Sequence, residues 1–155
     1  MVHDMRLLNA NSTSSANVLL VEDNRADAII TRKAFEATPT SINLYWVEHG
    51  LKCMQFLRKE GNYADVPTPD LVLLDINMPV MNGREVLAQI VNDDQLRKLP
   101  VVILTTSKDD RDLVDMYRLR CNSYIVKPVD FESFRDLVAQ VANYWFTVVL
   151  LPPTQ

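Results

Sequence analysis

Glycine is scarce in this chain, with only three among 155 residues, Gly50, Gly61 and Gly83. Their positions allow neither a G-x-G-x-x-G motif nor a Walker phosphate loop, so both glycine-rich nucleotide sites are excluded. The two cysteines, Cys53 and Cys121, and the two histidines show no metal-ligand or catalytic spacing. We therefore predict free thiols in a reducing compartment, no organic cofactor, and no role for either histidine.

Long apolar runs and an excess of positive charge are also absent. No stretch approaches the roughly 20 apolar residues that span a bilayer, and no signal-peptide core precedes residue 18. The net charge of −4 argues against a surface for nucleic acid or anionic membranes. We predict a cytoplasmic protein with one domain, since 155 residues suffice for a single core of ordinary size.

The chain does contain short apolar runs that each end in a chemically useful side chain. The runs are residues 18–21, 71–74, 101–104 and 124–126. The side chains that follow or end them are Glu22 and Asp23, then Asp75, then Thr105, and finally Lys127. Uninterrupted apolar runs are typical of strands buried on both faces, and parallel strands end at one edge of a sheet. We predict an α/β fold, a doubly wound five-stranded parallel sheet with helices on both faces.

The three carboxylates at these strand ends predict a cation site. Glu22, Asp23 and Asp75 would repel one another unless a cation neutralised them. Oxygen ligands suit Mg²⁺, which commonly binds beside phosphate. A carboxylate can also act as a nucleophile and form an aspartyl phosphate. With Lys127 and Thr105 available to bind phosphoryl oxygens, the residues predict magnesium-dependent phosphorylation of Asp75.

Each of these residues also has an ordinary structural interpretation. Glu22 and Asp23 could be a solvated strand exit, and Asp75 could be a helix N-cap or a turn residue. Thr105 could cap a strand, and Lys127 could be a surface charge. Their joint occurrence at the ends of four strands favours the chemical interpretation.

From about residue 17 to about residue 144, the chain resembles a response-regulator receiver domain of two-component signalling. Five positions carry the resemblance: Glu22, Asp23, Asp75, Thr105 and Lys127. The separations of 30 residues from Asp75 to Thr105 and 22 from Thr105 to Lys127 are similar to those of receivers.

The resemblance implies specific roles for these and neighbouring residues. The metal ligands would be Glu22, Asp23, Asp75 and the backbone carbonyl of Asn77. Asp75 would be the phosphoacceptor, Thr105 and Tyr124 the switch residues, and Lys127 the partner of the phosphoryl group. Asn77 and Ser107 would partly set the rate at which water hydrolyses the acyl phosphate.

The separation of 52 positions between Asp23 and Asp75 is longer than the common receiver pattern. This extension resembles the small receivers that serve cyanobacterial and bacterial phytochrome kinases. The resemblance implies a single-domain response regulator that takes a phosphoryl group from a sensor histidine kinase, with Mg²⁺, and signals through its fourth helix, last strand and last helix. It would not be an enzyme, although it would phosphorylate itself from small donors and dephosphorylate itself. The alternatives are a pseudo-receiver and a doubly wound enzyme of the flavodoxin-like or nucleotide-dependent kind.

The two ends of the chain differ from the predicted receiver domain, residues 17–146. Residues 1–16 contain most of the stretch NANSTSSAN, which is polar and lacks periodicity and predicts a disordered lead-in. Residues 147–155 are apolar, and a monomer rarely exposes a contiguous apolar patch of that kind. The tail therefore either folds back on its own domain or packs on a second subunit. We favour a homodimer that uses the fourth and fifth helices, the last strand and this tail.

Three local predictions concern the helices. Gly83 is expected at a turn with positive φ before the third helix. Leu51, Met54 and Leu57 are expected on the buried face of the second helix. Arg120 replaces a glycine that many receivers carry, so that it should end the fourth helix differently, or Asn122 should take the left-handed position.

Overall fold

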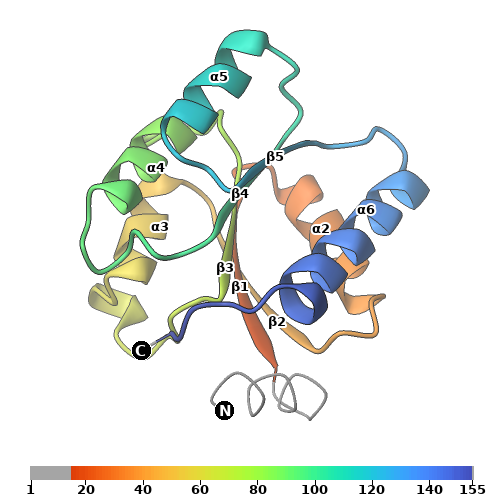
Figure 1. The fold of residues 1–155 in the computed structure, drawn as a ribbon, viewed down its shortest axis with the longest axis horizontal. Coiled ribbons are helices and arrows are strands. Elements are labelled where there is room, and N and C mark those ends of the chain that lie inside the picture. The colour runs from red at the N-terminus through yellow and green to blue at the C-terminus, as the bar shows by residue number, and fades with distance from the viewer. Residues whose placement is uncertain (1–14, 155) are drawn as a thin grey trace.

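A parallel five-stranded sheet forms the centre of the protein, as the computed structural model of residues 15–154 shows (Figure 1). The strands are β1 (Ala16–Val21), β2 (Ile42–Val47), β3 (Leu71–Leu74), β4 (Val101–Thr105) and β5 (Ser123–Val126). They alternate with helices α2 (Arg25–Glu36), α3 (Gly50–Leu57), α4 (Gly83–Val91), α5 (Asp110–Arg118) and α6 (Phe131–Asn143). The predicted doubly wound sheet is confirmed, with strand order β2-β1-β3-β4-β5.

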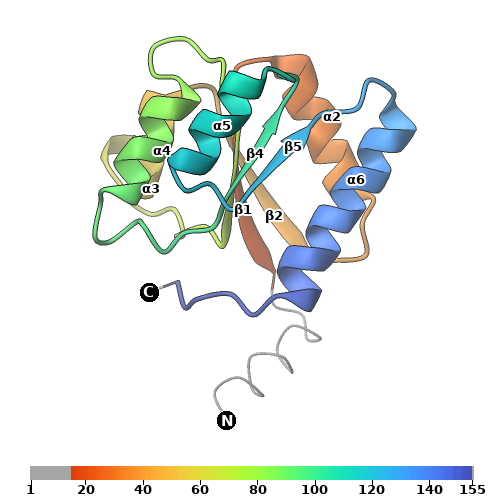
Figure 2. The ribbon, with the colours of Figure 1, turned by 45° about the horizontal axis from the view of Figure 1, so that its top comes forward.

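Helices cover both faces of the sheet, α2 and α6 on one side and α3, α4 and α5 on the other (Figures 1 and 2). Alternate residues of β1 point to the two sides: Leu19 and Val21 belong to one core cluster, Val18 and Leu20 to the other. Burial on both faces explains why the strands are continuous apolar runs. Both cysteines are free and buried. Within residues 15–154, no helix is long and apolar enough to cross a membrane.

The strand order reverses beside β1, which lies between β2 and β3. In such sheets, ligands bind at the carboxyl ends of the strands near this reversal. The register pairs Val21 with Leu74, so that the residues after them leave the sheet side by side. The backbone N–H of Asp75 donates to the carbonyl of Val21 over 3.1 Å, which holds the two strand ends together.

Two glycines allow the backbone to pack closely around the loop between β3 and α4. The prediction of positive φ at Gly83 is wrong, because Gly83 is not among the positive-φ residues, whereas Val80 is, at φ 67°. Glycine is required at position 83 for space, since a Cβ there would lie 2.4 Å from the carbonyl oxygen of Asp75. A Cβ on Gly50, at the start of α3, would lie 2.4 Å from the carbonyl of Met81. At both glycines, a backbone carbonyl of this loop region therefore lies where a side chain would have to go.

Helix α5 ends in a Schellman motif with Arg120 in the left-handed position, at φ 73°. The N–H of Arg120 donates to the carbonyl of Tyr117, and the N–H of Cys121 to that of Met116, each over 3.0 Å. Both alternatives predicted for Arg120 are therefore wrong, because the backbone keeps the glycine-type conformation with an arginine in it. The Asn122 side chain instead accepts a hydrogen bond from the N–H of Val101 over 2.7 Å.

The buried face of α3 differs partly from the prediction. Met54 and Leu57 are buried, but Leu51 is 43% exposed. Cys53 and Phe56 complete the buried face in its place. Leu51 is the second residue of the helix, and its side chain lies outside the face that packs on the sheet.

The C-terminal tail folds back across the amino end of the sheet, toward the side of α3 (Figures 1 and 2). A five-residue π-helix, Tyr144–Val148, continues α6, and the chain is then extended. Leu151 is only 9% exposed. Residues 152–154 line a cavity of about 170 Å³ together with Leu57, Pro69, Leu96, Leu99 and Pro100, among others. Of the two alternatives for the tail, contact with its own domain is thus present, while the homodimer remains a prediction. At the other end, β1 begins at Ala16, and residues 1–14 of the predicted lead-in lie outside the described residues.

Candidate functional site

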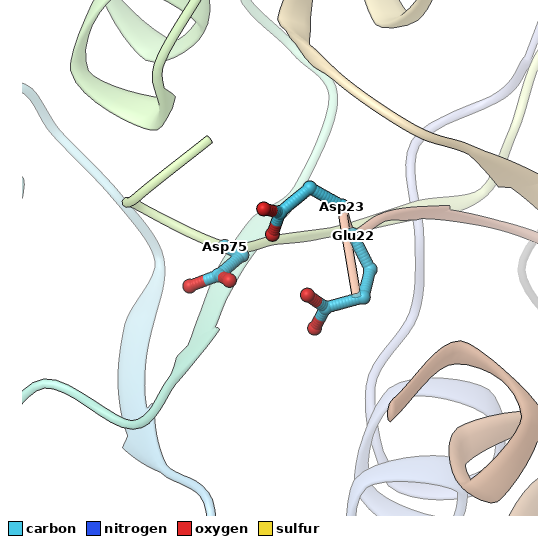
Figure 3. Close-up of side chains that lie close together, drawn as sticks. All are labelled: Glu22, Asp23 and Asp75. Carbon is cyan, nitrogen blue, oxygen red and sulfur yellow. The ribbon is translucent and has the colours of Figure 1, made fainter. Parts of the chain in front are cut away.

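Three carboxylates meet at the carboxyl ends of β1 and β3, around one space (Figure 3). Glu22 and Asp23 follow β1, Asp75 follows β3, and one carboxylate oxygen from each lies within 4.8 Å of the others. Glu22 is 1% exposed, Asp75 is half-buried and Asp23 is exposed. The predicted cluster is therefore assembled, and Asp75 is within reach of a molecule from solvent.

Backbone contacts fix Glu22 in the wall of this cluster. Its N–H donates to the carbonyl of Val47 over 3.0 Å, and its carbonyl accepts from the indole N–H of Trp46 over 2.7 Å. Its carboxylate accepts from the N–H of Asn24 over 3.2 Å. Burial raises the pKa of Glu22 to about 7, although the hydrogen bond and charge of Lys127 lower it. A nearby cation therefore decides how strongly this carboxyl group stays ionised.

Lys127 supplies a cation at the edge of the cluster. Its side chain is only 8% exposed, and its ammonium group donates to the carboxylate of Glu22 and, over 3.2 Å, to that of Asp27. Burial lowers the pKa of Lys127, but Glu22, Asp75 and Asp27 raise it more, so that the group is held in its charged form. Asp27 was not predicted; it stands in the first turn of α2, where an acid reads as an ordinary helix-start residue.

Asp75 does not cap a helix, and its predicted role as the phosphoacceptor stays a prediction. One of its oxygens accepts from the N–H of Ile76 over 2.8 Å. The N-cap of α4 is Asn82, which forms a capping box with Glu85, so the capping interpretation of Asp75 is excluded. Asn77 lies two residues further along the same loop and is exposed; its role as a ligand stays a prediction.

Thr105 and Tyr124 both contact the loop that follows β4. Thr105 is fully buried, and its hydroxyl oxygen accepts from the N–H of Ser107 over 3.3 Å. The hydroxyl of Tyr124 donates to the carbonyl of Ser107 over 3.0 Å. The N–H of Lys127 donates to the carbonyl of Thr105 over 2.7 Å. The two predicted switch residues are thus joined through Ser107, and Lys127 is fixed to the end of β4.

A second network, which the sequence did not predict, ties this loop to α4 and α5. The Ser107 hydroxyl donates to Asp112 over 2.5 Å. The guanidinium group of Arg84 donates to Asp112 and, over 3.3 Å, to Asp115. The hydrogen bond from Ser107, together with Arg84, lowers the pKa of Asp112. Asp112 and Asp115 share a face of α5 by their spacing, but the sequence offers no signal that Arg84 meets them.

The donor set of the cluster fits a divalent cation. All three side chains offer oxygen, the ligand that Mg²⁺ and Mn²⁺ accept at such sites. With all three ionised, Lys127 leaves two negative charges of the cluster unbalanced, which a divalent ion would neutralise. Glu22, Asp23 and Asp75 are the residues that could hold the ion.

Comparison with known proteins places this site in a family context. Residues 18–139 match the family model of the response regulator receiver domain. Response regulator Rcp1 of Synechocystis sp. is 36% identical over 135 residues, covering 87% of this chain and 92% of the relative. The probable methanogenesis regulatory protein FilR2 of Methanothrix harundinacea is 40% identical over 129 residues, covering 83% of this chain and 82% of the relative.

Solved structures agree with the sequence matches. The phosphorylated cyanobacterial phytochrome response regulator RcpA is 36% identical and aligns with a TM-score of 0.86, covering 90% of this chain and 100% of that chain. The Mn²⁺-bound form of Rcp1 is also 36% identical and aligns with a TM-score of 0.83, covering 89% of this chain and 99% of that chain. These two neighbours carry a phosphoryl group and a divalent metal, respectively, on the same fold.

Proposed function

The chain belongs to the response regulator receiver domain family, and from this premise we propose that it works as a single-domain phosphoacceptor. A sensor histidine kinase would transfer a phosphoryl group to Asp75, and the change would be read on the face formed by α5, β5 and α6. One observation carries this proposal. Glu22, Asp23 and Asp75 converge within 4.8 Å, beside the ammonium group of Lys127.

The transfer follows from the chemistry of these side chains. An oxygen of Asp75 attacks the phosphorus, the new O–P bond replaces the P–N bond of the phosphohistidine, and the imidazole leaves after taking up a proton. Lys127 and Thr105 bind the phosphoryl oxygens and stabilise the charge that develops in the transition state. Mg²⁺ held by Glu22, Asp23, Asp75 and the Asn77 carbonyl would neutralise charge on the transferred group. Water hydrolyses the acyl phosphate later, beside Asn77 and Ser107.

The new charge supplies the signal. A phosphoryl group adds about −1.5 to −2 charges at neutral pH. We propose that Lys127 then exchanges part of its contact with Glu22 and Asp27 for the phosphoryl oxygens, and that Thr105 turns toward them. The hydrogen bonds of Ser107 to Thr105 and Tyr124 carry this change toward α5 and β5.

We propose that the kinase docks beside the rim of the acidic cluster. A cavity of about 120 Å³ lies there, lined by Asp27, Lys127, Thr31 and Asp130 together with five apolar residues. Three of those apolar side chains, Ile30, Val129 and Phe131, are exposed. Apolar surface beside an ion pair suits a protein partner. The similarity to RcpA and Rcp1 supports a phytochrome as the kinase, in a cytoplasmic setting that keeps the buried thiols reduced.

We also propose a homodimer through α5, β5, α6 and the tail. Val114 and Tyr117 are exposed on α5, and Val148 and Leu150 are exposed in the tail. Leu151 faces the domain while its neighbour Leu150 stays 42% exposed, so that the tail can cover its own domain and still offer apolar surface to a second copy.

Intact-protein mass spectrometry after incubation with Mg²⁺ and acetyl phosphate tests the phosphoacceptor. We expect one phosphoryl group on the wild type and on the control Asp65→Asn, an exposed acid in another loop, and none on Asp75→Asn. Labelling of Asp75→Asn at the wild-type rate would move the acceptor elsewhere. If the wild type gains no mass from acetyl phosphate or a kinase and binds no Mg²⁺, the pseudo-receiver alternative replaces this proposal.

A further inference from the structure

A second charged site lies at the amino end of the sheet, away from the acidic cluster. It is a cavity of about 360 Å³ lined by residues of α4 and of the segments before β4 and β5. Figure 2 shows α4 and α5 together on this side of the sheet. Its apolar floor comes from α4, from the start of β4 and from the segment before it: Leu87, Ile90, Val91, Leu99 and Val101. Arg97, Lys98, Arg120 and Asn122 complete the lining.

The charge of this cavity is opposite to that of the chain. Acidic residues outnumber basic ones by 20 to 16, yet the lining contains three cations and no carboxylate. Arg97 meets Asp94 over 3.5 Å, but their side chains are 64% and 86% exposed, so water screens the pair. Within residues 15–154, neither Lys98 nor Arg120 takes part in an ion pair of 4.0 Å or less. The positive charge of the cavity is therefore largely uncompensated by the protein.

Arg120 lines this cavity at a backbone position where glycine would be more stable. Its φ of 73° is in the left-handed region, in which a Cβ is unfavourable. The Schellman hydrogen bonds of Arg120 and Cys121 would form equally well with glycine, so the end of α5 does not need an arginine. Strain of this kind often accompanies function, and here the strained residue is an arginine in the lining of the cavity.

From these observations we propose that the cavity lined by Arg97, Lys98 and Arg120 binds a small organic phosphate. Guanidinium groups match phosphate oxygens with paired N–H donors, and a lysine adds a point charge. The apolar floor beside the cations suits the ring of a nucleotide, and the volume is within the usual range of about 300–1,000 Å³ for ligand sites. A phosphate bound here would neutralise the cavity, which connects the end of α5 to β4.

NMR titration of ¹⁵N-labelled protein in metal-free buffer tests the site, with pyrophosphate, ADP and adenosine as probes and NaCl to hold ionic strength constant. We expect saturable shifts at the amides of residues 97–99 and 119–122, with the Lys127 amide unchanged. ADP binding tighter than pyrophosphate would assign a nucleotide, and equal affinities would assign the phosphate alone. Equal binding of adenosine, or equal shifts with NaCl alone, would overturn the proposal.

Two matched variants separate binding from folding. Arg120→Gly and Lys59→Gly each remove one cation and relieve a left-handed residue, because Lys59 ends α3 in the same motif at φ 56° but does not line the cavity. We expect both to raise the melting temperature slightly, and only Arg120→Gly to raise the Kd for ADP, about tenfold. Lys98→Gln should weaken binding as well. Wild-type affinity in both Arg120→Gly and Lys98→Gln would overturn the proposal.

Discussion

At the carboxyl edge of the sheet Lys127 is 8% exposed between Glu22 and Asp27, whereas at the amino edge Lys98 is exposed and forms no ion pair within residues 15–154. Both lysines lie next to strand ends of the same sheet. The first is fixed by buried partners and by the hydrogen bond of its N–H to Thr105. The second lies in an open cavity. Charge at the carboxyl edge is therefore held in place by partners from the protein, while the charge of Lys98 at the amino edge has no carboxylate partner among the described residues. Such fixed charge suits the proposed phosphoryl transfer, and such free charge suits the proposed phosphate ligand.

Replacing each of the two lysines in turn should give the largest difference between the two edges, in the rate of phosphorylation. We expect Lys127→Met to slow phosphorylation by acetyl phosphate about 100- to 1,000-fold, the usual effect of losing a group that stabilises transition-state charge. Metal binding should persist, because the three carboxylates remain. Lys98→Met should label at the wild-type rate. The time course of phosphorylated mass gives both rates, and equal rates in the two variants would remove the role assigned to Lys127.

The glycines make a second comparison, between close packing at the carboxyl edge and open space elsewhere. Gly83→Ala should lower the free energy of unfolding by about 2–3 kcal/mol, because its Cβ would meet the Asp75 carbonyl at 2.4 Å. Gly61→Ala should lower it by only about 1 kcal/mol, since nothing lies within 4 Å and only the positive φ opposes a side chain. Urea unfolding measures both. A larger loss at Gly61 would show that backbone conformation outweighs packing here.

Contact of the tail with its own domain and its proposed contact with a second copy can be separated by two variants. Leu151→Ala should lower the free energy of unfolding by about 2 kcal/mol, since the side chain is 9% exposed, and should leave self-association unchanged. Val148→Glu should leave stability nearly unchanged and weaken the dimer, because Val148 is 62% exposed. Sedimentation velocity at several protein concentrations measures the association. Unchanged association in Val148→Glu would contradict the dimer surface assigned to the tail.

Two arginine–aspartate pairs give the smallest expected contrast. A double-mutant cycle on Arg84 and Asp112 should return a coupling of about 1 kcal/mol, because both side chains are partly buried and Ser107 also donates to Asp112. The same cycle on Arg97 and Asp94 should return about 0.3 kcal/mol or less, because both are highly exposed. Urea unfolding of the single and double variants supplies the energies. Equal coupling energies would mean that the difference in burial between the two pairs does not change the strength of the ion pair.

The sequence predicted the acidic cluster because Glu22 and Asp23 together follow one buried apolar run and Asp75 follows another, and strand ends of a parallel sheet converge. It did not predict Asp27 or Arg84, since their partners Lys127 and Asp112 lie 100 and 28 residues away and no local pattern links them. The error at Arg120 has a different cause. Backbone preference favours glycine there, but the Schellman hydrogen bonds of Arg120 and Cys121 use backbone atoms only and form with an arginine in the left-handed position as well. Gly83 was predicted for its flexibility, whereas the packed structure needs its small size.

The glycine contacts of the β3–α4 loop have a mechanical consequence. Gly50 and Gly83 bring backbone against backbone at the Met81 and Asp75 carbonyls, so one wall of the acidic pocket has almost no room to yield. The opposite wall, the loop after β4, is held by side-chain hydrogen bonds of Thr105, Ser107 and Tyr124, which can exchange partners. A displacement that starts at Asp75 would therefore be blocked by the closely packed β3–α4 loop and would move the loop after β4 instead. The direction of any displacement at Asp75 is thus set by how these two walls are packed.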